Sequence, residues 1–340
     1  MGFTVDFHAE EEKNVRKTFF LVFIFLLIMA LFGLIIDIVF ALFPIFTIVL
    51  LVVALIQVLI SLKRGKQVVL RSLQARPLNE DDFDEKQLRN IVDELSIASG
   101  MAVPPEVYVI DNDKVLNAFA TGSNQENAVV CVTTGLLKTL NREETSGVIA
   151  HELSHIINRD VLLMTVISSL LGAVVILKIF ALRALFSYLR FGAYRSVAGR
   201  RRSSKSGDKS ALAIIAFLAA VAALGALFSF VGRLTLLAVS RTREYFADSR
   251  AVELTRNPSG LSSALRKIWS GSEKMKTASV ATAHLFVSDP LKRKLNNRTS
   301  FISNLFSTHP PIHSRIAILE NRSEEDVRNE LSALNEGSHH

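Results

Sequence analysis

The stretch from Ile149 to Leu171 places a metal-binding pattern directly before a long apolar run. His151 and His155 are four positions apart, so on a helix they share one face and can bind the same zinc ion. Glu152 then lies beside the metal without binding it, where its carboxylate can take a proton from an attacking water molecule. This His-Glu-x-x-His pattern predicts zinc-dependent hydrolysis.

A catalytic zinc site needs a third protein ligand and keeps its fourth position open. The best candidate is Glu244, in the sequence RTREYFADSRAVEL. Asp248 lies one helical turn later and can accept a hydrogen bond from a coordinating histidine. The spacing fits a second interpretation equally well, in which both acids lie on a solvated helix face and pair with nearby arginines. Three histidines also remain as rival ligands: His284, His309 and His313.

The zinc pattern lies within a predicted helix. Asn141 and Glu144 have the spacing of a capping box, which predicts a helix that begins near Arg142 and runs to Asp160. Five apolar residues form its buried face: Val148, Ile149, Leu153, Ile156 and Ile157.

The residues before this helix have the pattern of a globular domain. Helical spacing of apolar residues predicts a helix over residues 82–98, and Gly100 is a natural stop. Runs rich in β-branched residues predict strands at 106–110, 115–121 and 127–133, with turn residues near 122–124. We therefore expect an α+β fold that is mainly α-helical, with a small, partly antiparallel sheet beside helices.

Long apolar blocks indicate that the chain also enters a membrane. Hydrophobic residues make up 49% of the sequence, and residues 19–36 and 38–62 are each long enough to cross a hydrocarbon core of about 30 Å. The first block is too long for a signal peptide, and a second block follows at once. We expect a retained transmembrane hairpin over residues 19–62, which turns between Asp37 and Pro44, with Asp37 facing water or headgroups.

Two further blocks, 161–182 and 211–232, meet the same length criterion and bring the expected number of transmembrane helices to about four. Between them lies a basic loop, 183–210, whose full translocation would break the positive-inside rule. We favour crossing by both blocks, and partial entry into the bilayer is the alternative. Basic residues on both sides of the first hairpin place the N-terminus (1–18) and the domain that follows the hairpin in the cytoplasm.

Charge and cysteine content narrow the function classes. The net charge of +7 comes largely from basic residues beside apolar segments, where anionic headgroups of the lipid bilayer explain them. No nucleic-acid-binding motif is present, so we expect no nucleic-acid partner. Cys131 is the only cysteine, which excludes an intrachain disulfide and agrees with a reducing compartment.

The combination of motifs resembles the HtpX-type membrane-bound zinc metalloproteases, which are relatives of the CAAX prenyl proteases. The resemblance rests on HELSH followed by an apolar block, and on a Glu-x-x-x-Asp helix after a second apolar block. Three other stretches agree: NAFATG from Asn117, VTTGLL from Val132 and THPPIHSRIAIL from Thr308. The implied fold is a gluzincin-like cytoplasmic domain in two halves, 63–160 and 233–336, separated by membrane segments.

The resemblance implies roles for individual residues. It makes Glu244 the third ligand of one Zn2+ per chain, beside His151 and His155, with Asp248 as a supporting carboxylate. Arg315 would brace the site through a salt bridge, although a solvated arginine fits the sequence equally well.

The same resemblance implies a substrate cleft. Asn117, Ala118 and Phe119 would contact the substrate backbone as an edge strand that accepts an extended peptide; the alternative is a core strand flanked by turns. His309 would donate a hydrogen bond to the oxyanion; the alternative is a histidine packed at a helix start.

The implied activity is that of a membrane-anchored zinc endopeptidase. Its substrates would be damaged or misfolded membrane proteins or unfolded proteins, and its place the plasma (inner) membrane as a multi-pass protein. Two other readings stay open: a CAAX-type prenyl-protein protease and a catalytically silent membrane scaffold or holdase. The last four residues, 337–340, look like part of an affinity tag, and the sequence does not indicate an oligomeric state.

Overall fold

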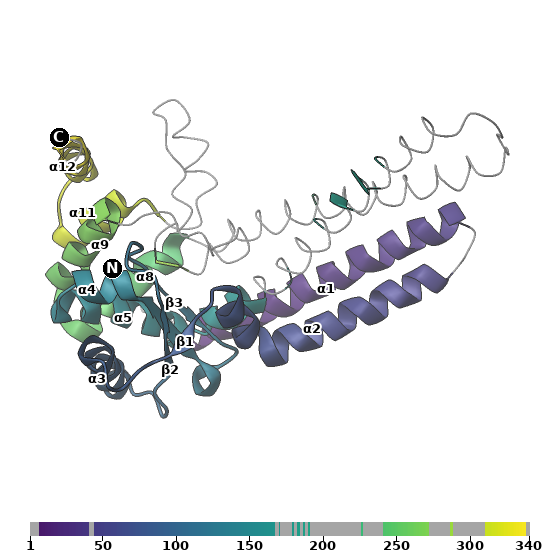
Figure 1. The fold of residues 1–340 in the computed structure, drawn as a ribbon, viewed down its shortest axis with the longest axis horizontal. Helices are drawn as coiled ribbons and strands as arrows, with labels where there is room; N and C mark the ends of the chain where they lie inside the picture. Colours follow the sequence, from purple (N-terminus) through teal and green to yellow (C-terminus); the bar gives the residue numbers. More distant parts are fainter. Residues whose placement is uncertain are drawn as a thin grey trace.

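The structure is a computed structural model, and it describes residues 7–40, 44–166, 241–271, 286–287 and 310–337, with a few single or paired residues between 170 and 226. Figure 1 shows a globular part, built from helices around a small sheet, and a long helical hairpin that projects from it. The hairpin consists of α1 (Phe7–Phe40) and α2 (Ile45–Ser72). The expectation of a mainly helical α+β fold is confirmed.

Within the described ranges, α2 is the one helix that is long and apolar enough to cross a membrane. A shorter apolar stretch, Thr18–Leu31, lies within α1. Of the predicted segment 161–182, the structure describes the helical residues 161–166 and three single residues, and most of the segment 211–232 and of the basic loop 183–210 lies outside the described residues. Four transmembrane helices therefore stay a prediction.

The turn of the hairpin corrects the expectation for Asp37. Its side chain is buried instead of facing water or headgroups. The carboxylate accepts hydrogen bonds from the backbone N–H groups of Phe46 and Thr47, at 2.8 and 2.9 Å, and from the Thr47 hydroxyl at 2.7 Å. Because the first N–H groups of a helix lack partners within the helix, Asp37 satisfies donors at the start of α2 and ties α1 to it.

Helix α2 also extends beyond the predicted end of the hairpin at residue 62. Lysine and arginine are good helix formers, so the basic residues after Leu62 do not end the helix. Its last turns carry Val69 and Leu70, which, with Leu73, are buried in a core cluster against Phe119 on one face of the sheet. The same helix therefore runs from the apolar hairpin into the core of the globular part.

The sheet is small and mixed, as expected. It has four strands in the order β1-β2-β4-β3: β1 (Arg76–Pro77), β2 (Glu106–Ile110), β4 (Val129–Thr133) and β3 (Ala118–Thr121). Strands β2 and β4 are parallel, and the other two pairs are antiparallel. Two strands are shorter than predicted, because the residues before β3 form a buried loop and residues 125–127 form a 3-10 turn (η1, Gln125–Asn127).

Helix α5 (Arg142–Ile157) lies at the centre of the globular part. It contacts β3 and three helices: α3 (Phe83–Ala98), α8 (Arg241–Thr255) and α9 (Pro258–Gly271). The remaining named helices are α4 (Thr134–Thr139), α11 (Ile312–Glu320) and α12 (Glu324–Gly337). The main hydrophobic core includes Val148, Ile149 and Leu153 of α5, so this helix is held on several sides.

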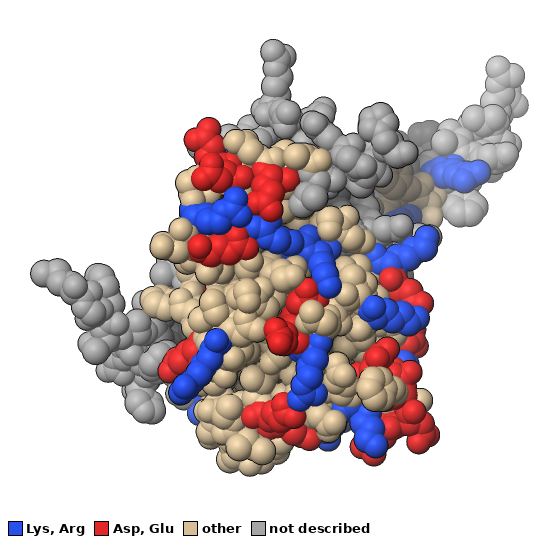
Figure 2. Space-filling view, turned by 90° about the vertical axis from the view of Figure 1, so that its left-hand side faces the viewer, with Lys and Arg blue, Asp and Glu red and all other residues tan. Residues whose placement is uncertain are grey.

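Figure 2 shows the surface at the end of the globular part remote from the tip of the hairpin. Basic and acidic side chains are interspersed over the described part of this face, without a large area of one sign. A mixed charged surface of this kind is typical of a protein face exposed to water.

Candidate metal centre

The zinc pattern is placed by the start of α5. The predicted capping box is present: Asn141 accepts a hydrogen bond from the Glu144 backbone N–H at 2.9 Å, and the Glu144 carboxylate accepts from the Asn141 N–H at 2.8 Å. Two turns further on, His151 and Glu152 are almost fully buried, and His155 is half-buried. Packing on β3, α8 and α9 therefore encloses the face of α5 that carries these side chains.

Three nitrogen and oxygen donors converge at this point. His151 Nε2 and His155 Nε2 are 3.3 Å apart; of the Glu244 carboxylate on α8, Oε2 lies 3.6 Å from His151 Nε2 and Oε1 lies 3.7 Å from His155 Nε2. Two ligands bound to one tetrahedral zinc ion, each at about 2.0–2.1 Å, lie about 3.4 Å apart. The observed separations therefore match a tetrahedral zinc site with three protein ligands.

The rival third ligands do not compete with Glu244 within the described residues. His313 lies in α11, where its Nε2 is 3.0 Å from a Glu324 carboxylate oxygen. His284 and His309 lie outside the described residues, so the oxyanion role of His309 stays a prediction. Among the described side chains, the group that could hold a metal ion is His151, His155 and Glu244.

The His151 ligand is oriented by Asp248 and Arg315. Asp248 Oδ1 is 2.9 Å from His151 Nδ1, so the ring donates through Nδ1 and leaves Nε2 for a metal. Arg315 is fully buried and holds Asp248 through two bonds, at 2.6 and 2.8 Å. The predicted salt bridge of Arg315 is therefore present, and the alternative of a solvated arginine is wrong, because the guanidinium group is buried against the carboxylate behind a ligand.

Electrostatics follow from this arrangement. Burial raises the pKa of Asp248, but Arg315 and His151 outweigh burial, so the pKa lies below its usual value. Burial and Arg315 both lower the pKa of His151, yet its hydrogen bonds to Asp248 and Glu244 raise it to about 9. A metal ion that binds Nε2 must therefore displace a proton.

The second ligand, His155, has its own buried carboxylate, which the sequence analysis missed. Asp160 Oδ2 lies 3.2 Å from His155 Nδ1, and its other oxygen accepts a hydrogen bond from Arg243 at 2.5 Å. Helix α5 ends at Ile157 instead of continuing to Asp160, because Arg159 adopts a left-handed conformation with φ of 54°. This turn brings Asp160 back toward the ring, so both histidines present Nε2 to the same point.

The charges around the site also fit a divalent cation. Four buried carboxylates gather around the two histidines, and two of them form ion pairs with guanidinium groups. The carboxylates belong to Glu152, Asp160, Glu244 and Asp248, and the guanidinium groups to Arg243 and Arg315.

The Asp160 contact leads to a prediction about metal affinity. Replacing Asp160 with asparagine keeps the shape but removes the charge that orients His155 and pairs with Arg243, so we expect zinc to bind about 10–100-fold more weakly. Competition with a chelating dye measures this affinity. Asp93→Asn, on the exposed side of α3, is the matched control and should bind zinc normally. Equal zinc affinity in both variants would exclude a positioning role for Asp160.

The residues predicted to contact substrate lie beside the metal centre, at the edge of the sheet. Ala118 and Phe119 belong to β3, which has β4 on one side, and both are fully buried. On the other side, the Val287 N–H donates to the Ala118 carbonyl at 3.0 Å, and Phe286 packs edge-on against Phe119. A segment of the chain itself therefore pairs with the predicted peptide-binding edge.

Asn117 precedes β3 and turns inward. Its backbone N–H donates to the Thr133 hydroxyl, and its carbonyl accepts from the Thr133 N–H, both at 3.0 Å. Both of these backbone groups of Asn117 are thus used toward β4, whereas the Ala118 carbonyl bonds to the outer edge through the Val287 N–H.

Comparisons with known proteins agree with this site. The model of the family described as "Peptidase family M48" matches residues 82–323, a range that includes the three metal-binding side chains. A "Protease HtpX homolog" from Caldanaerobacter subterraneus subsp. tengcongensis is 38% identical over 314 residues, which cover 91% of this chain and 96% of the relative. Homologues with the same name from Dictyoglomus turgidum and Listeria monocytogenes are 38% and 36% identical, and each alignment covers 91% of this chain and 93% or 97% of the relative. No solved structure matches the chain.

Proposed function

Because the chain belongs to peptidase family M48 and is an HtpX-type protease, we propose that it is a zinc-dependent, membrane-anchored endopeptidase. The observation that carries the zinc assignment is the set of ligand distances between His151, His155 and Glu244, which match a tetrahedral site. Family M48 implies a metal ion, and the donors present are those that zinc prefers.

The chain's own residues provide the proton transfers. Zinc held by His151, His155 and Glu244 would supply a Lewis acid for the peptide carbonyl and would increase the acidity of water. Glu152, buried on α5 between the two histidine ligands, accepts the proton from the attacking water and later donates it to the leaving amine. Asp248 and Asp160 hold the two imidazoles in the orientation that the ligands need. In this proposal His309 stabilises the oxyanion.

An extended peptide would bind along β3. The outer edge of this strand already pairs with another segment of the chain. Phe119 forms an antiparallel bridge with Phe286, and the Ala118 carbonyl accepts a hydrogen bond from the Val287 N–H. A substrate strand would take over these contacts, with main-chain bonds that give affinity and little sequence preference. Substrate binding would therefore require the Phe286–Val287 segment to leave the edge.

The proposed substrates are damaged or misfolded membrane proteins and unfolded proteins. Support comes from α2, which runs without interruption from its apolar part into the core cluster under β3. If α2 crosses the bilayer, the metal centre is held close to the membrane surface. Placement in the inner membrane, with several spans and a cytoplasmic protease domain, belongs to the same proposal.

The test is degradation of casein, an unfolded protein, by the purified full chain in detergent. We expect cleavage that is lost after treatment with a chelator and restored by one equivalent of zinc per chain. A prenylated peptide run in parallel should be a poor substrate. Preferential cleavage of that peptide would favour the CAAX-type reading. If the zinc-loaded chain cuts neither substrate, the protease proposal is wrong, and a scaffold role becomes the better account.

A further inference from the structure

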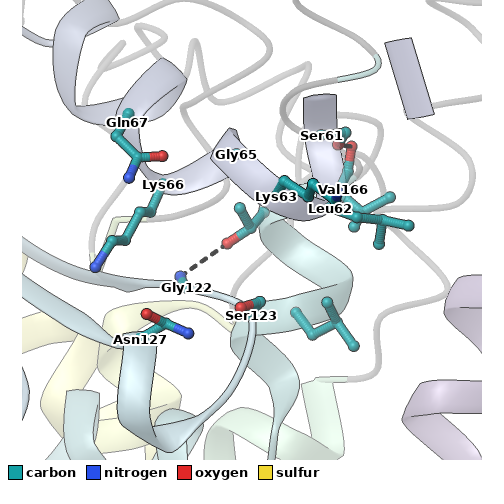
Figure 3. A pocket seen from close by; sticks show the side chains of 12 residues that line it. Ser61, Leu62, Lys63, Gly65, Lys66, Gln67, Gly122, Ser123, Asn127 and Val166 are labelled. Atoms are coloured by element: carbon teal, nitrogen blue, oxygen red, sulfur yellow. Dashed lines mark hydrogen bonds between the residues drawn. The ribbon is translucent and has the colours of Figure 1, made fainter. Parts of the chain in front are cut away.

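A small cavity lies where the hairpin meets the globular part. It has a volume of about 80 Å³ and is bounded by three elements: α2, the turn between β3 and β4, and the helical residues 160–166. Figure 3 shows α2 above the β3–β4 turn, with Lys66 reaching toward the turn that carries Asn127. The cavity lies apart from the metal centre, and none of the metal-binding side chains lines it.

The walls of this cavity are held together by Thr165. Its hydroxyl accepts a hydrogen bond from the Gly122 backbone N–H at 3.0 Å, drawn as a dashed line in Figure 3, and also lies 2.8 Å from the Thr121 hydroxyl. Gly65 lets α2 approach closely, because a Cβ atom there would lie 2.7 Å from the Thr165 methyl group. The cavity is therefore part of a packed junction and not a gap between independent parts.

The lining has the charge of an anion site. Its charged residues are Lys63 and Lys66, and no carboxylate lines the cavity. The Lys66 ammonium group pairs with the Glu106 carboxylate at 2.9 Å, whereas Lys63 is exposed to solvent. Neutral hydrogen-bonding side chains complete the polar part of the lining: Ser61, Gln67, Ser123, Asn127 and Thr165.

The size of the cavity suits a phosphate group. A site for one water molecule needs about 10–15 Å³ of cavity volume, so a cavity of about 80 Å³ has room for a larger polar group. The lining also has an apolar part, formed by Leu62, Leu162 and Val166. Val166 belongs to the cluster that packs against the apolar part of the hairpin. A lining that is cationic in one part and apolar in another fits an amphiphile better than a free ion.

The position along α2 indicates the source of the phosphate. From Ile45 to Leu62 the helix carries no charged residue, and Lys63 is the first. If α2 crosses the bilayer, as the proposed function has it, the cavity lies one turn beyond the hydrocarbon core, at the depth of the lipid headgroups. We propose that this cavity binds the phosphate of an anionic phospholipid through Lys63 and Lys66. The bound lipid would fasten α2 to the β3–β4 turn and to the helix that begins at Asp160.

Native mass spectrometry of the full chain in detergent, titrated with phosphatidylglycerol, tests this site. Lipid binding is measured without substrate, so it can be detected even if the chain does not cleave proteins. The lipid-site proposal can therefore fail or succeed independently of the proposed protease function. The variant is Lys63→Gln/Lys66→Gln. The matched control, Arg64→Gln/Arg71→Gln, removes two exposed charges from the same helix, and neither residue lines the cavity.

Nonspecific electrostatic attraction between the protein and anionic lipid should weaken in both double variants, because each variant loses two positive charges near the membrane. The site predicts that the Lys63/Lys66 variant loses about 10-fold more affinity than the control. Glu106→Gln, which breaks the Lys66 salt bridge without removing cavity charge, should bind phosphatidylglycerol at least as well as the unaltered chain.

Three results would overturn the proposal. Equal weakening in both double variants would show diffuse attraction only. Equal binding of phosphatidylcholine would remove the requirement for an anionic lipid. Competition by millimolar inorganic phosphate, with the same dependence on Lys63 and Lys66, would show a site for free phosphate instead of a lipid.

Discussion

Glu152→Gln is expected to reduce casein cleavage by about 10²–10⁴-fold while leaving one zinc per chain. Removing a positioned general base costs a rate factor of this size. The amide has nearly the same shape as the carboxylate but cannot accept the proton of the attacking water. The ligand separations among His151, His155 and Glu244 do not involve Glu152, so the metal should remain bound. Initial cleavage rates and zinc content, measured on the same preparation, test this result.

Glu143→Gln is the matched control for this substitution. Glu143 also lies on α5, but its carboxylate is exposed and bonds to Asn257, away from the metal centre. Its activity should equal that of the unaltered chain. Cleavage by Glu152→Gln at the normal rate would exclude this glutamate as the base. Loss of zinc together with activity would instead show that Glu152 acts through the structure of the site.

Local spacing was enough to predict the part of the site on α5. His151, Glu152 and His155 lie within two helical turns, and the helix period alone places both histidines on one face. Glu244 could not be selected in this way, because its approach depends on how α8 packs against α5. From spacing alone, a role of Glu244 as metal ligand was no better supported than a role in a surface ion pair. The family resemblance was needed to favour the ligand role.

Asp160 was missed for a geometrical reason. In one continuous helix, residues five apart point about 140° away from each other, so Asp160 would lie far from the His155 ring. The left-handed conformation of Arg159 ends that helix and turns the chain so that the Asp160 carboxylate lies next to the His155 ring. An acid five residues after the second histidine, and Arg243 directly before Glu244, were visible in the sequence. Their meaning depended on a single backbone angle that the pattern does not reveal.

The sheet edge was predicted only in part. The β-branched run predicted β4 and its neighbours, and β3 does lie at the end of the strand order. The contact of Phe286 and Val287 with this edge joins residues far apart in sequence and has no periodic pattern. The pairing is accompanied by the edge-on contact of the Phe119 and Phe286 rings, a long-range contact that local sequence patterns do not predict.

Arg315→Met is expected to cause the largest loss of stability among the site variants. Arg315 is fully buried, and both bonds to Asp248 lie in the interior. Burial lowers its pKa, but Asp248 and the carboxylates of Glu244 and Glu152 raise it above the usual value, so the side chain stays charged. Removing one partner of a buried ion pair leaves the other uncompensated, at a cost of about 3–5 kcal/mol. Chemical denaturation of the full chain in detergent measures the loss.

The control is Arg328→Met. Arg328 pairs with Glu324 at 3.3 Å, but its side chain is 60% exposed, and an exposed ion pair contributes about 0–1 kcal/mol. Arg315→Lys keeps the positive charge but cannot form the two parallel hydrogen bonds to Asp248. Its stability should therefore lie between that of Arg315→Met and that of the unaltered chain.

The double variant Asp248→Asn/Arg315→Met separates stability from metal binding. If the cost of Arg315→Met comes from an unpaired buried charge, removing the charge of Asp248 restores much of the stability. It cannot restore zinc affinity, because His151 still lacks the carboxylate that orients its Nδ1. Recovery of stability with persistently weak zinc binding would therefore assign Arg315 to the support of a ligand. Recovery of both properties, or of neither, would show that the guanidinium group acts on the fold alone.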